Sequence, residues 1–443
     1  MTNVLRQLIF GLLLFGALQA LGDPLDRIPR PPSNGEQVPP HLRIRFVPEY
    51  ERHLDRVVLT VGSSSSSVGP VEARRIIAAL PTYTQISLFS HHPAILPKGD
   101  VLSIFGPSSK LRIFHNLTHP WTQDLGEGTA ERFLLGMKGI LHRVPLQNLD
   151  IPMEEHFLPL DGGNVQLARN REGEKIVFLG GSEFRETEGF MVAAGITNAN
   201  AHTRRMYRET FDADKVVVLP NWEAEHIDQS VLLVGDGQAV TEALPEMSAD
   251  EFWLVLQYQS KLAGIAHHGD NVRVPLYAPD YEGTTRILSP RQRDRRSRPT
   301  EQVPSQWMSP AQVLLFVKYR TEVPHFNDLL LNWRHTEQRH RTEALLEANG
   351  FKITRLKTTI WHQLNCMHFV NAMPFRNRET GETELLFPVY HLPGDSPDDF
   401  NPTRLRKQNR DNVITLESIG LGVRPVQSVF GTGGNLHCMI YQF

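Results

Sequence analysis

Short apolar segments rich in β-branched residues alternate with longer amphipathic segments along most of this 443-residue chain. The short segments have the length and composition of strands. They cover residues 57–61, 85–89, 111–114, 176–179, 216–219 and 230–234. Helical periodicity marks residues 130–137, 201–211, 249–263 and 311–349, the last interrupted near Pro324. Strands and helices intermixed from end to end predict an α/β fold rather than separate all-α and all-β domains.

The first 22 residues have the pattern of a secretory signal peptide. Arg6 precedes an apolar run at residues 8–18, and the small residues Ala20 and Gly22 lie just before Asp23. A membrane-spanning helix needs about 20 apolar residues, so cleavage before Asp23 is favoured over a retained membrane anchor or a buried terminal helix. We expect the mature protein to be secreted or periplasmic, without stable membrane insertion.

The remaining chain divides into a leader and one large domain. Residues 23–50 are rich in proline and are predicted to form an extended linker, followed by a catalytic domain over residues 51–443. Lysine and arginine number 46 against 49 acidic residues, and this net charge of −3 gives no support for nucleic-acid binding. No glycine-rich phosphate loop lies between a strand and a helix, so nucleotide chemistry is not indicated.

A histidine and an aspartate two positions apart, His226 and Asp228, precede the apolar segment 230–234. If the strand that contains residues 230–234 begins as early as His226, both side chains project to the same face, because residues two apart in a strand share a face. A histidine beside a carboxylate can act as a general acid and base, or can bind a metal ion.

A glycine-rich segment near the carboxyl end leads directly into a cysteine. Three glycines at positions 431–434 precede His437 and Cys438. Glycines let the backbone approach a ligand closely, and a thiolate in a partly open, electropositive setting is a nucleophile. The other cysteine, Cys366, lies in an apolar stretch and is predicted to be a small buried hydrophobic residue.

Two further segments each carry an aspartate close to glycine. Residues 121–126 read Trp-Thr-Gln-Asp-Leu-Gly, and residues 160–164 read Leu-Asp-Gly-Gly-Asn. Taken separately, each segment is typical of a turn.

Taken in chain order, the four segments resemble the guanidino-group-modifying enzyme superfamily, in particular peptidylarginine deiminases and agmatine deiminases. Residues 121–124 are similar to the family's Trp-x-Gln/Arg-Asp, and residues 161–164 to its Glu-Gly-Gly segment. Residues 226–228 are similar to its His-x-Asp, and residues 433–438 to the Gly-Gly-x-x-His-Cys that carries the nucleophile. The resemblance extends from about residue 111 to the carboxyl end. It implies a five-bladed pseudosymmetric α/β propeller of ββαβ-type units around a central active site.

The resemblance also implies roles for individual residues. Cys438 would be the nucleophile, His226 the general acid and base, and Asp124 and Asp228 the carboxylates that bind the guanidinium. Asp161 stands where the family has glutamate, so its side chain is one methylene shorter, and it would bind substrate or shape the pocket. The further residues expected to contact substrate are Trp121, Gly163, Asn164 and Gly434.

The chemistry suits these residue types, since a planar guanidinium is held in a bidentate manner by carboxylates and stabilises a neighbouring thiolate. The expected reaction converts an arginine side chain to citrulline and ammonia through a covalent cysteine intermediate, and the favoured substrate is arginine within a peptide. No cofactor or metal is expected. Agmatine or free arginine are alternative substrates, and transfer of the amidino group is an alternative reaction. Two other classes stay open: a metal-dependent hydrolase with His226, Asp228 and His437 as ligands, and a non-catalytic secreted binding protein.

Overall fold

The structure is a computed structural model of the chain. It describes residues 28–61, 70–90, 111–115, 126–129, 131–137, 140, 152–220, 226–243, 272–275, 305–308, 333–357, 369–391, 402–429 and 436–442.

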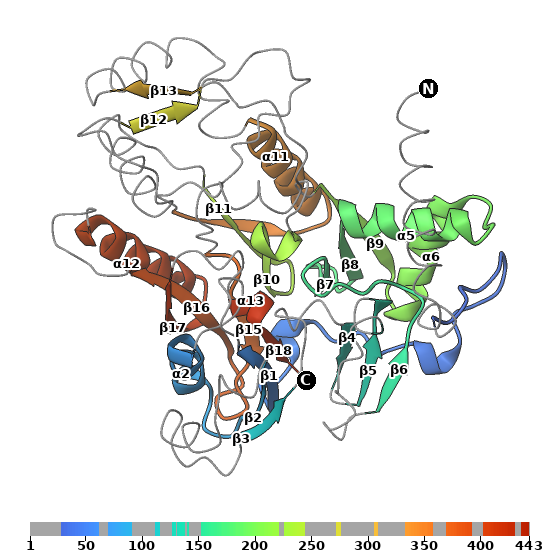
Figure 1. The fold of residues 1–443 in the computed structure, drawn as a ribbon, viewed down its shortest axis with the longest axis horizontal. Coiled ribbons are helices and arrows are strands. Elements are labelled where there is room, and N and C mark those ends of the chain that lie inside the picture. Colours follow the sequence, from blue (N-terminus) through green and yellow to red (C-terminus); the bar gives the residue numbers. More distant parts are fainter. Residues whose placement is uncertain are drawn as a thin grey trace.

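Small sheets, rather than one large sheet, make up the β structure (Figure 1). Among the described residues, five of the six sheets repeat one arrangement: a strand is antiparallel to one neighbour and parallel to the other. These strands are β1 (Arg56–Val61), β5 (Arg132–Leu135), β8 (Lys175–Gly180), β11 (Gln238–Glu242) and β16 (Thr383–His391). Their antiparallel neighbours are β18 (Ile440–Gln442), β4 (Gly126–Thr129), β7 (Val165–Arg169), β10 (Leu232–Gly235) and β15 (Met373–Arg376). Their parallel neighbours are β2 (Gln85–Ser90), β6 (Met153–Glu155), β9 (Lys215–Leu219), β14 (Lys352–Leu356) and β17 (Gly422–Val429).

Three further strands complete the described sheets. β3 (Leu111–His115) extends the first sheet in parallel with β2, and β12 (Val272–Pro275) pairs with β13 (Ser305–Met308). None of the sheets in the described part of the chain closes into a barrel. The mixed α/β content predicted from the alternating segments is therefore confirmed.

Helices occupy the connections between parallel strands, because parallel neighbours cannot be joined by a tight turn. In the part of the chain that the structure describes, four of these connections contain helices. They are α2 (Pro70–Ala79) after β1, α5 (Gly181–Ala193) with α6 (Ala199–Thr210) after β8, α11 (Trp333–Ala348) after β11, and α12 (Pro402–Ser418) after β16. The sheets of β8, β11 and β16 thus have a ββαβ-type order of elements, whereas in the sheet of β1 the antiparallel strand, β18, comes from the other end of the described chain.

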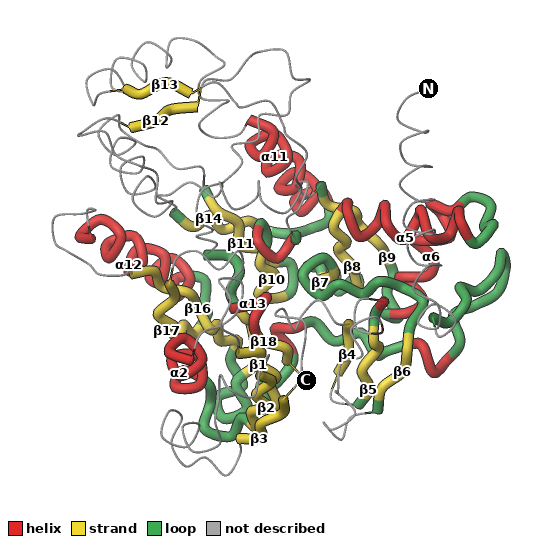
Figure 2. Tube along the Cα trace, in the orientation of Figure 1, coloured by secondary structure: helices red, strands yellow, loops and turns green. Residues whose placement is uncertain are grey.

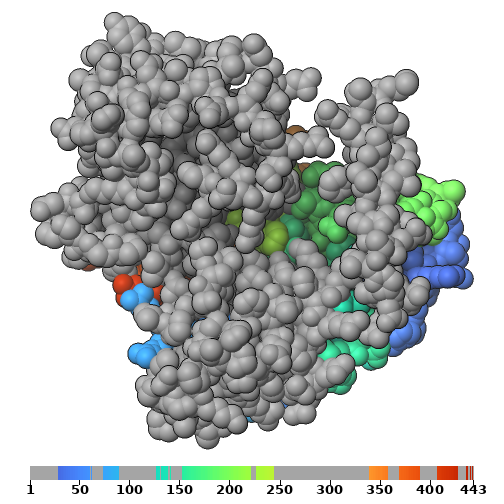
Figure 3. Space-filling model, viewed as in Figure 1, coloured from blue at the N-terminus to red at the C-terminus, as the bar shows by residue number. Residues whose placement is uncertain are grey.

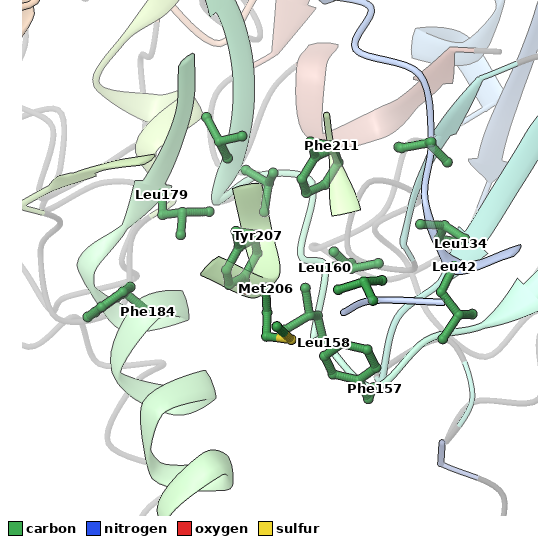
Figure 4. Close-up of a cluster of buried hydrophobic side chains, with 14 of the residues drawn as sticks. Leu42, Leu134, Phe157, Leu158, Leu160, Leu179, Phe184, Met206, Tyr207 and Phe211 are labelled. Carbon is green, nitrogen blue, oxygen red and sulfur yellow. The ribbon is translucent and has the colours of Figure 1, made fainter. Parts of the chain in front are cut away.

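One of the hydrophobic clusters shows why α6 forms where it does (Figure 4). The buried positions of α6 recur at intervals of three and four residues, which gives the helix one buried face. These positions are Ala199, His202, Thr203, Met206, Tyr207 and Thr210. The apolar members of this face pack against β7, β8 and the segment that leads to β7. Each fully buried large apolar side chain contributes about 1.5–3 kcal/mol to stability.

The proline-rich leader packs into the protein, so the prediction of an extended linker is wrong. Val38, Leu42, Ile44 and Phe46 are buried in the same cluster as α6. The backbone N–H of Ile44 also donates to the carbonyl of Thr210 at 2.8 Å. In the space-filling view the blue leader borders the green residues of α5 and α6 (Figure 3). The apolar residues between its prolines cover the hydrophobic surface that α6 presents. The proline-rich composition alone does not indicate this burial.

The leader ends in a 3₁₀ turn, η3 (Glu49–Glu51), that lies among several sheets. This turn contacts β7, β10, β15 and β16, which belong to three different sheets. The short helix α13 (Leu436–Met439) contacts β16 and β18 and lies near the middle of the view, among these sheets (Figure 2). The first and the last described parts of the chain therefore meet in the interior.

The strand predictions are confirmed within one or two residues for β1, β2, β3, β8, β9 and β10, as is the helix α6. The helix predicted at residues 130–137 is wrong, because this stretch forms β5. A short apolar run can belong to a strand or a helix by periodicity alone, and here Phe133, Leu134 and Leu135 are buried one after another between β4 and β6. The second half of the predicted helix 311–349 is present as α11 (Trp333–Ala348). Residues 311–332 and the predicted helix 249–263 lie outside the described residues.

No helix in the described ranges is long and apolar enough to cross a bilayer. The predicted signal peptide at residues 1–22 lies outside these ranges.

Candidate active site

His226 and the loop at residues 161–164 are in direct contact. Nε2 of His226 lies 3.3 Å from Oδ2 of Asp161. The carboxylate of Asp161 is 3% exposed, whereas the imidazole is 21% exposed. The buried carboxylate and the Gly163 backbone, against which Nδ1 lies, hold the imidazole in one orientation. Asp161 therefore orients His226 here, and its predicted contact with substrate stays a prediction.

The loop around Asp161 is a tight turn held by its own backbone. The Gly163 N–H donates to Oδ1 of Asp161 at 3.2 Å, and the Asn164 N–H donates to the Asp161 carbonyl at 2.7 Å. Leu160, the residue before the turn, has a φ of 52°, in the left-handed region that branched side chains rarely adopt. Leu160 is fully buried in the cluster of Figure 4. Core packing thus holds a strained residue that directs Asp161 toward His226.

Gly163 is required because the imidazole of His226 lies against its backbone. A methyl group on Gly163 would lie 2.1 Å from Nδ1 and 2.7 Å from Cγ of that ring. We expect Gly163→Ala to displace His226 and to lower kcat roughly tenfold or more, with the fold retained. Gly189→Ala in α5, where an added methyl group has no atom within 4 Å, is the control. Melting curves of both variants check that they are folded. Equal kcat in the two variants and the native protein would contradict the role given to Gly163.

His226 and Asp228 do not project to one face as a strand would make them. Residues Ile227–Gln229 form a 3₁₀ turn, η6, and the strand β10 starts only at Leu232. The Asp228 N–H donates to the Gly163 carbonyl at 3.1 Å, so η6 and the 161–164 loop are joined through the backbone as well. The turn sends the two side chains to different partners, because a 3₁₀ turn rotates successive residues by about 120°.

Asp228 is bound to the histidine that precedes the predicted nucleophile. Nδ1 of His437 lies 2.8 Å from Oδ2 of Asp228, and Nε2 of the same ring lies 2.8 Å from Oε2 of Glu49. Both His437 and Asp228 are about 1% exposed. Burial works against a charged imidazole, but the two carboxylates outweigh it and raise the pKa of His437 to about 10. At neutral pH the ring is an imidazolium that donates from both nitrogens.

The backbone of α13 is fixed next to this imidazolium. The His437 N–H donates to the carbonyl of Asn371 at 3.3 Å, and the Asn371 side chain donates to the Asp228 carbonyl at 3.4 Å. Cys438 follows His437 directly and lies within α13. The predicted nucleophile is therefore carried by a helix in which the residue directly before it, His437, is bound to both Asp228 and Glu49.

A second buried pair lies near the first. Arg52 and Glu127 are both largely buried, with Nη2 of Arg52 3.7 Å from Oε2 of Glu127. Burial raises the pKa of Glu127 to about 7; the charge of Arg52 acts against this rise, and that of Glu49 adds to it. Glu127 lies three positions after Asp124, at the start of β4.

The structure thus brings together part of the predicted site. Asp161, Gly163, His226 and Asp228 are in contact, and Asp228 is joined through His437 to the helix of Cys438. Asn164 is buried at the start of β7, where its carbonyl accepts from the Gly180 N–H. Outside the described residues lie Trp121, Asp124, Cys366 and Gly434.

The sequence motifs do not include four residues of this region: Arg52, Glu127 and Asn371, which are buried, and Glu49, whose side chain is 14% exposed. Glu49 lies in the leader, 388 positions from His437. The motif at residues 433–438 includes His437, but it gives this residue no role, and the residue types alone suggest only a metal ligand.

His437 is not placed to act as a metal ligand. Both of its ring nitrogens donate to carboxylates, so neither is available to coordinate a metal ion. Within the described ranges, no three histidine, cysteine, aspartate or glutamate residues are grouped so that they could hold one.

No protein-family model and no curated protein matches this chain. Among solved structures, the cyanobacterial arginine dihydrolase ArgZ is similar over 42% of this chain at 10% identity and a TM-score of 0.23, and the match spans only 26% of that enzyme. The amidinotransferase SxtG from Microseira wollei is similar over 90% of this chain and 96% of its own, at 8% identity and a TM-score of 0.33. DDAH from Pseudomonas aeruginosa is similar over 43% of this chain and 70% of its own, at 7% identity and a TM-score of 0.21. Similarity at these TM-scores carries no inference about activity.

Proposed function

We propose that this protein is a guanidino-group-modifying enzyme that hydrolyses the guanidinium of arginine side chains in peptides. The products are a ureido group, as in citrulline, and ammonia. We further propose that the five repeated sheets are the five units of the fold that this superfamily uses, and that the mature protein is secreted or periplasmic.

One observation carries the proposal: three chain segments with the superfamily's motifs converge. The loop with Asp161 holds His226, the η6 turn holds Asp228, and Asp228 binds His437 beside Cys438. Residues 65 or more positions apart in the chain thus meet around one interior region, and their types are those that guanidine hydrolysis needs.

The reaction follows from these residue types. The thiolate of Cys438 attacks the guanidinium carbon and forms a tetrahedral adduct. His226 donates a proton to one nitrogen, the bond from carbon to that nitrogen breaks, and ammonia leaves a thiouronium on Cys438. Water then attacks the same carbon while His226 takes its proton. The bond to sulfur breaks last, and the hydroxyl proton passes to solvent, which returns the thiolate and releases the neutral ureido product.

Two carboxylates would hold the substrate for this attack. In the proposal Asp124 and Asp228 bind the guanidinium nitrogens and place its carbon over the sulfur. The planar cation in turn stabilises the thiolate, which is why no separate base for Cys438 is needed.

Peptidyl arginine is the proposed substrate for two reasons. Gln123 before Asp124 resembles the peptidylarginine deiminases more than the Trp-x-Arg-Asp usual in agmatine deiminases. A secreted enzyme also meets proteins far more often than free agmatine.

The test measures ammonia and ureido product from a blocked arginine peptide, agmatine, free arginine and a methylated arginine, with the purified full chain. We expect the highest kcat/KM for the blocked peptide. A preference for agmatine of about tenfold or more would overturn the peptidyl assignment and leave the deiminase chemistry. Product formation only after an amine acceptor is added would identify a transferase, and no reaction with any guanidino compound would overturn the proposed function.

A further inference from the structure

His437 is the centre of a buried chain of charged groups that no motif predicts. Its ring bridges Glu49 and Asp228, each at 2.8 Å, and its side chain is 2% exposed. Glu49 and Asp228 come from distant parts of the sequence: Glu49 from the leader and Asp228 from the η6 turn. The only covalent neighbour of His437 with proposed chemistry is Cys438.

Glu49 is held at this place from several directions. Pro48 precedes η3 with its φ at −58°, and the N–H of Arg52 closes the turn on the Glu49 carbonyl at 2.9 Å. Tyr50 is buried, and its hydroxyl donates to Asp236 at 2.9 Å while it accepts from the Arg169 N–H at 3.0 Å. The turn therefore has little freedom to withdraw Glu49 from His437.

Arg52 ties the end of the same turn to two more strands. Its carbonyl accepts from the Arg376 N–H at 2.8 Å, in β15, and from the side chain of Gln442 at 3.1 Å, in β18. The segment that delivers Glu49 is thus bound to the strand that follows α13.

We propose that Glu49 is a positioning residue of the active site: it binds His437, and His437 in turn fixes the carboxylate of Asp228 and the helix that carries Cys438. This inference rests on the proposed function of Asp228 and Cys438. The leader is then part of the catalytic machinery, although its composition is that of a linker.

The charges around the ring explain why Glu49 matters. The charged groups that face His437 or its partners in the described part of the chain are Glu49 on η3, Arg52 directly after η3, Asp228 on η6, and Glu127 on β4. Burial alone would raise the pKa of Glu49, but His437 and Arg52 bring it below its usual value. With one carboxylate on each nitrogen, the imidazole stays protonated and cannot rotate. Without Glu49, one nitrogen loses its acceptor and the ring is free to turn away from Asp228.

The test compares Glu49→Gln with the native protein in two measurements. The first follows the His437 ring by nitrogen-15 NMR of histidine-labelled full chain, with His437→Gln used to assign its signal. We expect the pKa of His437 to fall by about one to three pH units in Glu49→Gln. The second is the pH profile of kcat. In Glu49→Gln we expect kcat to be lower by roughly tenfold or more, and to change further with pH where His437 now loses its proton.

Glu51→Gln is the matched control. Glu51 lies in the same turn, but its carboxylate pairs with Arg169 at 3.2 Å and is 31% exposed. We expect this variant to keep both the His437 titration and the pH profile of the native protein. If Glu49→Gln does not fold, Glu49→Asp replaces it, with the expectation of a smaller fall in the same pKa because the charge is kept on a shorter side chain.

An unchanged His437 titration in the Glu49 variant would overturn the proposal, as would an unchanged pH profile of kcat. The NMR measurement needs no substrate. If the native protein hydrolyses no guanidino compound, the proposed function fails, while the link from Glu49 to His437 is still decided by the titration.

Discussion

Ammonia release is expected to fall by about 10³-fold or more when Cys438 is replaced by alanine. Without the thiolate no covalent intermediate forms, and binding of the guanidinium alone leaves only a slow attack by water. The substitution removes one sulfur atom from a short helix, so the melting temperature should change little. The measurement is ammonia and ureido product formed from a blocked arginine peptide, with melting curves for both proteins.

Cys366→Ala is the control for the loss of a thiol, and it should keep most of the activity. Alkylation with iodoacetamide should abolish activity in both the native protein and Cys366→Ala. Turnover that persists in Cys438→Ala would remove the covalent mechanism, whatever the substrate.

The second large effect is expected at Asp228. Asp228→Asn should lower kcat/KM by about 10²-fold or more, because the carboxylate that would bind the guanidinium also holds His437. Loss of a charged hydrogen bond in this buried position should also destabilise the protein by about 1.5–3 kcal/mol at neutral pH. Asp212→Asn is the control, since that carboxylate is 71% exposed and pairs with Lys175 at the surface. Equal kcat/KM in Asp228→Asn and the control would contradict the role of Asp228.

The stability of Asp228→Asn should also depend on pH in a defined direction. The folded native protein keeps a proton on His437 up to a pKa of about 10, whereas the unfolded chain releases it near 6.5. The contribution of this proton to stability is therefore complete below pH 6.5 and is lost as the pH rises through 10. Removing one carboxylate lowers the pKa of His437, so the two proteins should differ most in neutral solution and converge as the pH approaches 10. Urea unfolding at several pH values measures this, and a difference that grows with pH would contradict it.

Much of the fold could be predicted because its signals are local. β-branched runs such as that of β8, and the three-and-four spacing of buried residues in α6, depend only on neighbours in the chain. The stretch around Phe133 was misread because a four-residue apolar run carries no usable period. The leader was misread for a different reason: its burial depends on α6, which supplies the surface that Leu42 and Ile44 cover.

The candidate site could be predicted only as far as its motifs reach. The motifs predict that Asp161 and His226 belong to one site, but not that the two side chains contact each other. Glu49 could not be found this way, because a glutamate in a proline-rich segment gains its role only through a contact with a residue 388 positions away. The different partners of His226 and Asp228 depend on a 3₁₀ turn that a strand-like sequence conceals.

The central claim is that Cys438 forms a covalent bond to a guanidinium carbon during turnover. Mass spectrometry of peptides from the full chain, quenched in acid during reaction with a blocked arginine peptide, tests it most directly. The account predicts that the peptide containing Cys438 carries the substrate minus ammonia, that the peptide containing Cys366 does not, and that the adduct is absent in Cys438→Ala. Steady release of ureido product by the native protein with no adduct on Cys438 at any quench time would contradict the account.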